Sequence, residues 1–133
     1  MGTAVTTLRP MTVDDVAPVA ALEADQQPRP WSEKTFGDEL AADGRIYVVA
    51  VDDTVIVGFG GVMLVGEEAH VTNLLVDTGS RRRGIGRRLM VELIGSAVAA
   101  GARHLTLEVR KENHGARVLY SNLGLAPVGV RPR

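Results

Sequence analysis

The segment RRRGIGRR at positions 81–88 combines residue types that bind anions. Glycines at 84 and 86 allow the main chain to come close to a ligand, and the arginines supply charge-assisted hydrogen bonds. The segment precedes a predicted amphipathic helix, whose first N–H groups carry positive dipole character. It therefore predicts a pyrophosphate site, although a solvated basic helix start would have the same composition.

Two other phosphate-binding motifs do not fit this segment. A P-loop needs Lys and then Ser or Thr after its second glycine, and Ile85 and Gly86 occupy those positions. A dinucleotide-binding fingerprint needs a third glycine where Leu89 stands.

The spacing of Arg81, Gly84 and Gly86 resembles the pyrophosphate signature of the GNAT acetyltransferases. Three further segments resemble one branch of that family, the ribosomal-protein-alanine acetyltransferases: PRPWSEKTF, LEVRKEN and ARVLYSNLGL. The resemblance covers nearly the whole chain. It implies a single N-acetyltransferase domain over residues 1–133 that uses acetyl-coenzyme A as acetyl donor, without a metal.

The resemblance also implies where the donor binds. In the family, the strand before the pyrophosphate loop splays from its neighbour, and its main chain pairs with the pantetheine arm. This assigns Leu74, Leu75, Val76 and Asn113 to the pantetheine side. The pyrophosphate is assigned to Arg82, Arg83, Gly84, Ile85, Gly86 and Arg87. Without the family, the three apolar residues of the strand would be interpreted as core.

Acetyl transfer to an amine needs a proton acceptor for the amine and a proton donor for the departing thiolate. Glu108 lies on the polar face of a predicted strand at 104–110, and Tyr120 lies on the helix that follows. From the pattern alone, Glu108 could equally pair with Arg110 or Arg103 in solvent, and Tyr120 could be a core residue. The resemblance implies that Glu108 is the base and Tyr120 the acid, with direct attack of the amine on the thioester.

The acceptor is less well defined by the sequence. The branch places its acceptor peptide near the loop at Trp31 and the helix that begins at Glu33, where Asp38 and Glu39 add negative charge. The resemblance implies the N-terminal α-amine of a protein, the first candidate being the N-terminal alanine of a ribosomal protein. A small amine, a lysine, or a non-catalytic acyl-coenzyme A binding module remain alternatives.

Composition narrows the class of protein. The formal net charge is −1, which gives no overall field toward nucleic acid or an anionic membrane. The chain has no cysteine, and its three histidines lack metal-ligand spacing. No stretch is apolar enough to span a bilayer, so we expect a cytoplasmic protein. Apolar residues make up 45% and aromatic residues 4%, which predicts a core of aliphatic side chains.

The elements that must position these residues follow from hydrophobic periodicity and turn signals. The predicted strands are 5–9, 45–53, 54–66, 70–77, 104–110 and a last edge strand after Gly124; the predicted helices are 13–24, 33–40, 85–100 and 113–123. For the third helix the predicted buried stripe is Ile85, Leu89, Leu93, Ile94, Ala97 and Val98. The order β-α-α-β-β-β-α-β-α-β predicts a mixed-sheet α/β fold of the GNAT type.

The family pattern continues beyond the last residue, Arg133, with a further strand and a tyrosine-bearing hairpin. A chain without them is expected to bind the donor but acetylate poorly, or to borrow a strand from a partner. We therefore expect a monomer or a weak homodimer.

Overall fold

The computed structural model describes residues 5–81 and 83–107. Within them the chain forms one five-stranded sheet in which strand order follows chain order. The strands are β1 (Thr6–Pro10), β2 (Arg45–Asp52), β3 (Val55–Val65), β4 (Glu68–Val76) and β5 (His104–Leu107). The first four pair antiparallel, and β5 lies parallel to β4. The predicted mixed α/β architecture is confirmed through β5, and the helix and strand expected after it lie outside the described residues.

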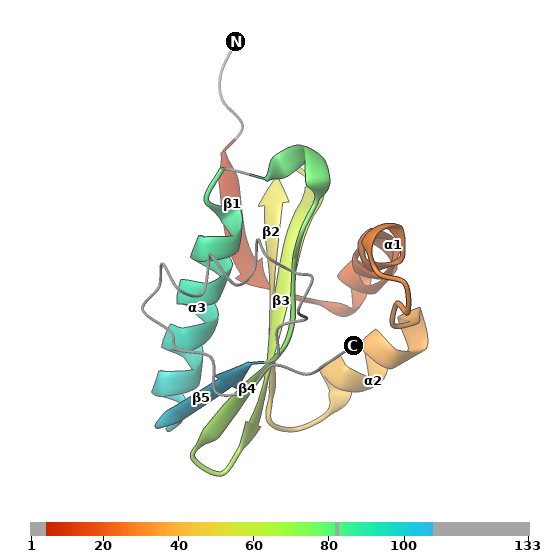
Figure 1. Cartoon of the computed structure of the whole chain (residues 1–133). Coiled ribbons are helices and arrows are strands. Elements are labelled where there is room, and N and C mark those ends of the chain that lie inside the picture. Colours follow the sequence, from red (N-terminus) through yellow and green to blue (C-terminus); the bar gives the residue numbers. More distant parts are fainter. Residues whose placement is uncertain (1–4, 82, 108–133) are drawn as a thin grey trace.

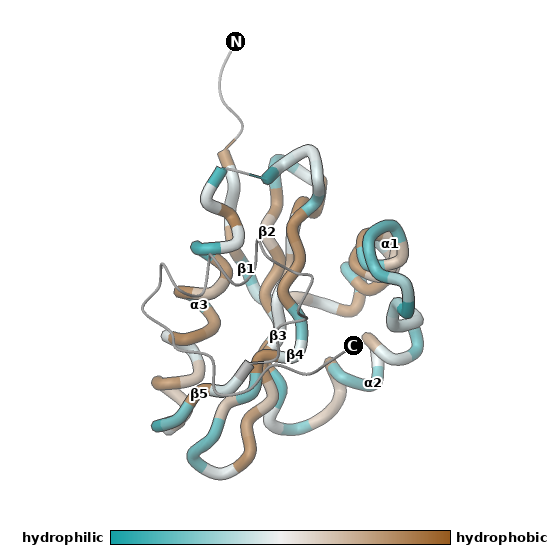
Figure 2. The backbone as a smooth tube through the Cα atoms, viewed as in Figure 1, coloured by the Kyte–Doolittle hydropathy of each residue, from teal (hydrophilic) through white to brown (hydrophobic). Residues whose placement is uncertain are grey.

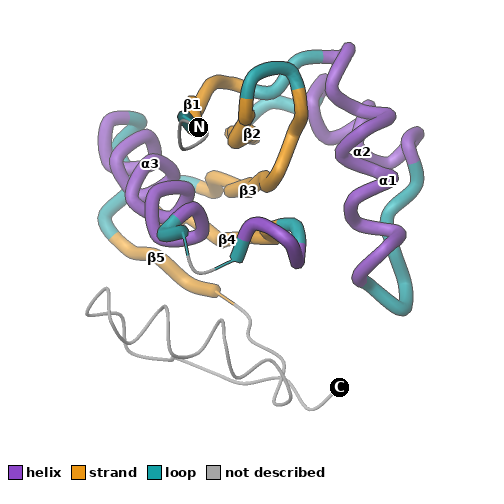
Figure 3. Tube along the Cα trace, turned by 90° about the horizontal axis from the view of Figure 1, so that it is seen from above, coloured by secondary structure: helices purple, strands orange, loops and turns teal. Residues whose placement is uncertain are grey.

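Helices cover both faces of the sheet (Figure 1). One face carries α3 (Ile85–Ala99), and the other carries α1 (Val16–Gln26) and α2 (Glu33–Ala41). Figure 3 shows the resulting three layers from above, with the sheet in the middle. None of the helices in the described part of the chain is long and apolar enough to cross a membrane.

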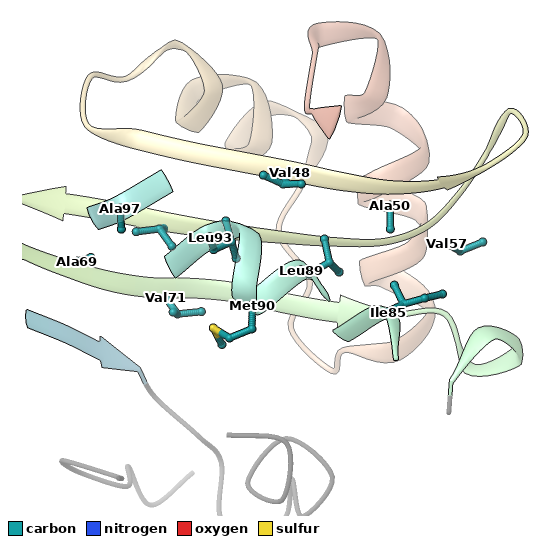
Figure 4. Close-up of a cluster of buried hydrophobic side chains, with 11 residues drawn as sticks. Val48, Ala50, Val57, Ala69, Val71, Ile85, Leu89, Met90, Leu93 and Ala97 are labelled. Atoms are coloured by element: carbon teal, nitrogen blue, oxygen red, sulfur yellow. The ribbon is translucent and has the colours of Figure 1, made fainter. Parts of the chain in front are cut away.

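Two hydrophobic clusters fix these layers, because successive residues of a strand point to opposite faces. The cluster under α3 contains Val48, Ala50, Val57, Val62, Ala69, Val71, Ile85, Leu89, Met90, Leu93 and Ala97 (Figure 4). The cluster under α1 and α2 contains Met11, Val16, Val19, Ala20, Phe36, Tyr47, Val49, Val51, Phe59 and Leu75. The hydrophobic colouring of the central strands in Figure 2 reflects this double burial.

The buried stripe of α3 differs from the predicted one at Val98 and Met90, and Ile94 is only partly buried. Ile85, Leu89, Leu93 and Ala97 are buried as predicted, but Val98 is 62% exposed. Met90, which the prediction omitted, is fully buried. Residues four apart from Ile85 to Ala97 lie on the side of the helix that faces the sheet, and Met90 lies beside them. Val98 lies outside this interface.

The connection from β1 to α1 also differs from the prediction of a helix starting at Val13. Residues Val13–Asp15 form a 3-10 turn, and α1 starts at Val16. The Asp15 carboxylate accepts hydrogen bonds from the Thr12 main-chain N–H at 2.7 Å and from both terminal nitrogens of Arg9. The bond from Thr12 closes a tighter first turn, and the bonds from Arg9 tie this turn to β1.

Glycines of β3 allow close packing on both faces of the sheet. A Cβ on Gly60 would lie 2.7 Å from Cδ1 of Leu93 in α3, and a Cβ on Gly61 would overlap the ring of Tyr47 on the other face. Gly60 therefore allows α3 to pack closely on the sheet, and Gly61 allows the Tyr47 ring to lie against β3.

Candidate active site

The edge of β4 that faces β5 is only partly paired among the described residues. The parallel ladder joins Glu68–Val71 of β4 to β5, and residues 72–76 have no strand partner on that side within residues 5–81 and 83–107. A bulge separates the two parts, because Val62 pairs with Val71 while Gly61 pairs with Asn73, which leaves Thr72 as the extra residue. The bulge therefore separates the part of β4 that pairs with β5 from the part that leads to the arginine-rich segment.

The three strand residues assigned to the donor pack their side chains against the core. Leu75 belongs to the cluster under α1 and α2, and Leu74 and Val76 pack partly against the cluster under α3. Leu75 is buried, whereas Leu74 and Val76 are partly exposed. Their assignment to pantetheine stays a prediction.

Gln26, the last residue of α1, connects the end of β4 with the start of the arginine-rich segment. Its Nε2 donates to the Val76 carbonyl oxygen at 3.1 Å, and its Oε1 accepts from Nη2 of Arg81 at 2.7 Å. Sequence reasoning did not single out Gln26, because its partners lie about fifty residues further along the chain. The residue bridges the helix layer and the predicted pyrophosphate loop.

The arginine-rich segment ends at the N-terminus of α3. Gly84 precedes the helix with a φ of +76°, a left-handed conformation that favours glycine. Among the described residues no side chain caps the helix start, and Ile85 anchors it in the core with 2% exposure. The first N–H groups therefore remain available to an anion, next to the exposed side chain of Arg87.

Arg83, assigned to the pyrophosphate, makes an ion pair with β2 in this structure. Its Nη1 lies 2.7 Å from Oδ2 of Asp52, and its Nη2 donates to the Thr6 hydroxyl at 2.9 Å. The hydrogen bond from Arg83 lowers the pKa of Asp52. Arg88 donates to the Thr6 carbonyl oxygen at 2.9 Å. Arg83 therefore ties the loop to the sheet, and Asp52 competes with a phosphate for its guanidinium.

Glu23 is a buried carboxylate that the sequence analysis missed. It lies on α1 with 6% exposure and accepts hydrogen bonds from the Trp31 main-chain N–H and, at 3.3 Å, from Nδ2 of Asn73. Burial raises its pKa, and the two hydrogen bonds partly oppose that rise. Glu23 thus joins the loop after α1 to β4 just after its bulge.

The structure places the two predicted acceptor residues on that same loop and the helix after it. Trp31 is half-buried, and its ring packs on Phe36 with centroids 5.4 Å apart. Glu33 is exposed at the first turn of α2, where the Ser32 hydroxyl caps the helix by accepting from Thr35 N–H at 3.1 Å. Trp31 is thereby fixed beside Glu23, whereas Glu33 faces solvent.

The other two acidic residues of α2 are occupied by partners within the chain. Asp38 pairs with Lys34 at 2.9 Å, and Glu39 accepts from Nε of Arg45 at 3.0 Å and from the Tyr47 hydroxyl at 2.8 Å. Burial is the main cause that raises the pKa of Tyr47. In residues 5–81 and 83–107, no three His, Asp or Glu side chains are grouped to hold a metal ion.

Four predicted site residues lie outside the described residues: Arg82, Glu108, Asn113 and Tyr120. Their assigned roles stay predictions. The last described residue of β5, Leu107, immediately precedes Glu108 in the sequence and pairs with Val71 of β4.

A strand that leads through a glycine-arginine turn into the N-terminus of a helix is the arrangement that the sequence resemblance required. Comparison with known proteins agrees, since residues 16–125 match the model of the acetyltransferase (GNAT) family. The chain belongs to the GNAT family. It is an N-acetyltransferase of that family, as the predicted enzyme class stated.

Individual relatives indicate which members of the GNAT family the chain is similar to. A ribosomal protein bS18-alanine N-acetyltransferase of Salmonella typhimurium is 32% identical over 134 residues, covering 94% of this chain and 84% of the relative. The crystal structure of the ribosomal-protein-S18-alanine N-acetyltransferase from Escherichia coli has a TM-score of 0.82 and 30% identity, covering 90% of this chain and 77% of that chain. The paia N-acetyltransferase from Thermoplasma acidophilum, solved in complex with coenzyme A, shares the fold at 14% identity with a TM-score of 0.81, covering 90% of this chain and 88% of that one.

Proposed function

We propose that this GNAT chain transfers the acetyl group of acetyl-coenzyme A to the α-amine at the N-terminus of a protein, the N-terminal alanine of a ribosomal protein being the first candidate. The observation that carries the proposal is the similarity over 94% of the chain to an enzyme named for that reaction. The similarity to the Escherichia coli structure, at 30% identity, supports the same acceptor.

The described site fits the donor. The uncapped N-terminus of α3 and the exposed Arg87 supply N–H groups and positive charge for the pyrophosphate. We assign the main-chain groups of β4 after the bulge, residues 72–76, to the amide-containing pantetheine arm. A coenzyme A thioester carries the pyrophosphate at one end of its extended pantetheine arm, and the amides lie along that arm.

The chemistry that we propose is direct attack by the amine. The amine nitrogen forms a bond to the acetyl carbonyl carbon, and the carbon–sulfur bond breaks. Glu108 takes the proton that the amine loses, and Tyr120 gives a proton to the departing thiolate. Holding donor and acceptor on one protein lowers the entropic barrier of this step without a covalent enzyme intermediate.

The test measures release of coenzyme A from acetyl-coenzyme A with three acceptors: an Ala-initiated peptide, the same peptide with a blocked N-terminus, and a polyamine. Turnover of the unblocked peptide alone is expected. Glu108→Gln should lower that turnover by a factor of about 10²–10⁴ and leave coenzyme A affinity nearly unchanged. Glu92→Gln, which changes an exposed glutamate on α3, is the matched control and should retain full turnover.

Two results would contradict the proposal. Turnover of the polyamine alone would indicate a small-amine acetyltransferase. Binding of coenzyme A without turnover of any amine would indicate a non-catalytic acyl-coenzyme A binding module.

A further inference from the structure

Glu23 lacks a counter-ion among the described residues. The described ion pairs engage Asp15, Asp38, Glu39, Asp52 and Glu67. Glu23 is buried and has two hydrogen-bond donors, the Trp31 N–H and the Asn73 amide, but no Lys or Arg. A buried carboxylate that is hydrogen-bonded but not neutralised favours a cation nearby.

Asn73 carries an unused acceptor beside this carboxylate. Its Nδ2 donates to Glu23 at 3.3 Å, while its Oδ1 is buried and has no hydrogen-bond partner among the described residues. The opposite amide orientation would place Oδ1 against the carboxylate oxygen, so Glu23 fixes which end of the amide is free. A buried acceptor left without a donor is costly, and such groups usually have a partner in the working state of a protein.

Asn73 lies close to the loop that is predicted to bind the acceptor. Asn73 follows the bulge at Thr72 and begins the part of β4 that has no partner on the β5 side among the described residues. Its side chain lies on the face covered by α1 and is linked through Glu23 to the loop at Trp31. The amide oxygen therefore lies between β4, just after its bulge, and the loop predicted to bind the acceptor.

We propose that Asn73 receives the reactive amine of the acceptor, its Oδ1 accepting a hydrogen bond from that amine, and that Glu23 orients the amide and supplies negative charge for a primary ammonium. The inference rests on the proposed function, because it assigns residues to the acceptor side of the same site. Asn73 is then a substrate-binding residue, and Glu23 is a positioning residue that acts through it.

The test compares binding of two peptides to the coenzyme A complex by titration calorimetry. One is the Ala-initiated peptide, and the other is its desamino analogue, in which hydrogen replaces the N-terminal amine. The wild type should bind the amine peptide about tenfold more tightly than the analogue, the factor typical of a hydrogen bond to a charged group. Asn73→Ala should abolish this preference and leave affinity for coenzyme A within about twofold.

Three further variants distinguish loss of amine recognition from a general loss of folded structure. Glu23→Gln keeps the size and an acceptor for the Trp31 N–H, so it should retain part of the preference, whereas Glu23→Ala should lose it. Gln27→Ala truncates an amide at the C-cap of α1 and should keep the full preference. Steady-state kinetics of Asn73→Ala should show a raised KM for the peptide with an unchanged KM for acetyl-coenzyme A.

The outcomes distinguish this inference from the proposed function. If the wild type acetylates the Ala-initiated peptide and Asn73→Ala keeps the preference for the amine, the inference is wrong and the proposed function stands. If the wild type accepts only a polyamine, the proposed function is wrong. Loss of the preference for polyamine over an uncharged analogue in Asn73→Ala would then still support the inference. If no amine is preferred over its analogue by the wild type, the inference is overturned.

Discussion

Arg83 and Asp52 form an ion pair with a nitrogen–oxygen distance of 2.7 Å, and this contact fastens the predicted pyrophosphate loop to the end of β2. The same guanidinium cannot hold Asp52 and a phosphate equally well. The carboxylate therefore competes with the donor for Arg83.

Removal of that carboxylate is expected to tighten donor binding. In Asp52→Asn, Arg83 no longer has an anionic partner in β2, so the dissociation constant for coenzyme A should fall by about threefold, the scale of an exposed ion pair. Titration calorimetry at low salt measures it. Asp53→Asn removes the same charge from the neighbouring exposed turn residue and should change affinity little. An unchanged affinity in Asp52→Asn would show that Arg83 does not reach the phosphates.

Asp15 should make the stability of the protein depend on acid pH. Its hydrogen bonds with Arg9 lower its pKa from 3.8 to about 2. A carboxylate whose pKa is lower when folded stabilises the fold above its ordinary pKa, and this stabilisation is lost as pH falls through about 2. Because Arg9 is 41% exposed, we expect about 1–2 kcal/mol near pH 6.

Urea unfolding of the wild type and Asp15→Asn between pH 6 and pH 2 measures this contribution. The difference in the free energy of unfolding should be largest near pH 6 and should shrink below about pH 4. Asp14→Asn, at the exposed neighbouring position, is the control. A difference that is constant across this range would assign the effect to lost packing instead of the ion pair.

Gly61 is expected to tolerate no side chain. A Cβ there overlaps the Tyr47 ring, so Gly61→Ala should lower the free energy of unfolding by about 1–3 kcal/mol. Gly95→Ala makes the same change in α3, where the added Cβ meets nothing within 4 Å, and should stabilise by about 0.5–1 kcal/mol. Thermal and urea unfolding measure both. Equal effects of the two substitutions would contradict the close approach of Tyr47 to β3.

The buried face of α3 can be tested by truncating two apolar residues. Met90 is fully buried and Val98 is 62% exposed. Met90→Ala should cost about 2–5 kcal/mol, whereas Val98→Ala should stay within about 0.5 kcal/mol of the wild type. Urea unfolding compares them. A larger loss in the free energy of unfolding for Val98→Ala than for Met90→Ala would support the buried stripe predicted from the sequence.

Local patterns in the sequence predicted the framework well. The period of 3.6 residues located α3, the β-branched runs around Asp52 and Asp53 located the β2–β3 hairpin, and Ser32 correctly marked the start of α2. These features depend on residues close together in the chain, which is why periodicity and capping rules predict them.

The sequence could not predict contacts between distant segments. Burial of Glu23 depends on Asn73, which lies fifty residues away, and the orientation of Arg83 depends on Asp52 and Thr6 in other strands. Within α1, Glu23 has the pattern of a surface glutamate, and Arg83 has the pattern of a phosphate ligand. Tertiary packing decides both, so neither contact could be predicted from the local pattern of the sequence.

Strand order in the sheet follows chain order, and this affects the order in which the strands pair during folding. The β2–β3–β4 meander requires only hairpins between consecutive strands, whereas pairing of β4 with β5 requires the crossover through α3. Contacts between near neighbours in the chain close at lower entropic cost than crossovers. We therefore expect the donor surface to be completed late in folding, after the meander, so that coenzyme A binding during refolding reports arrival at the native state.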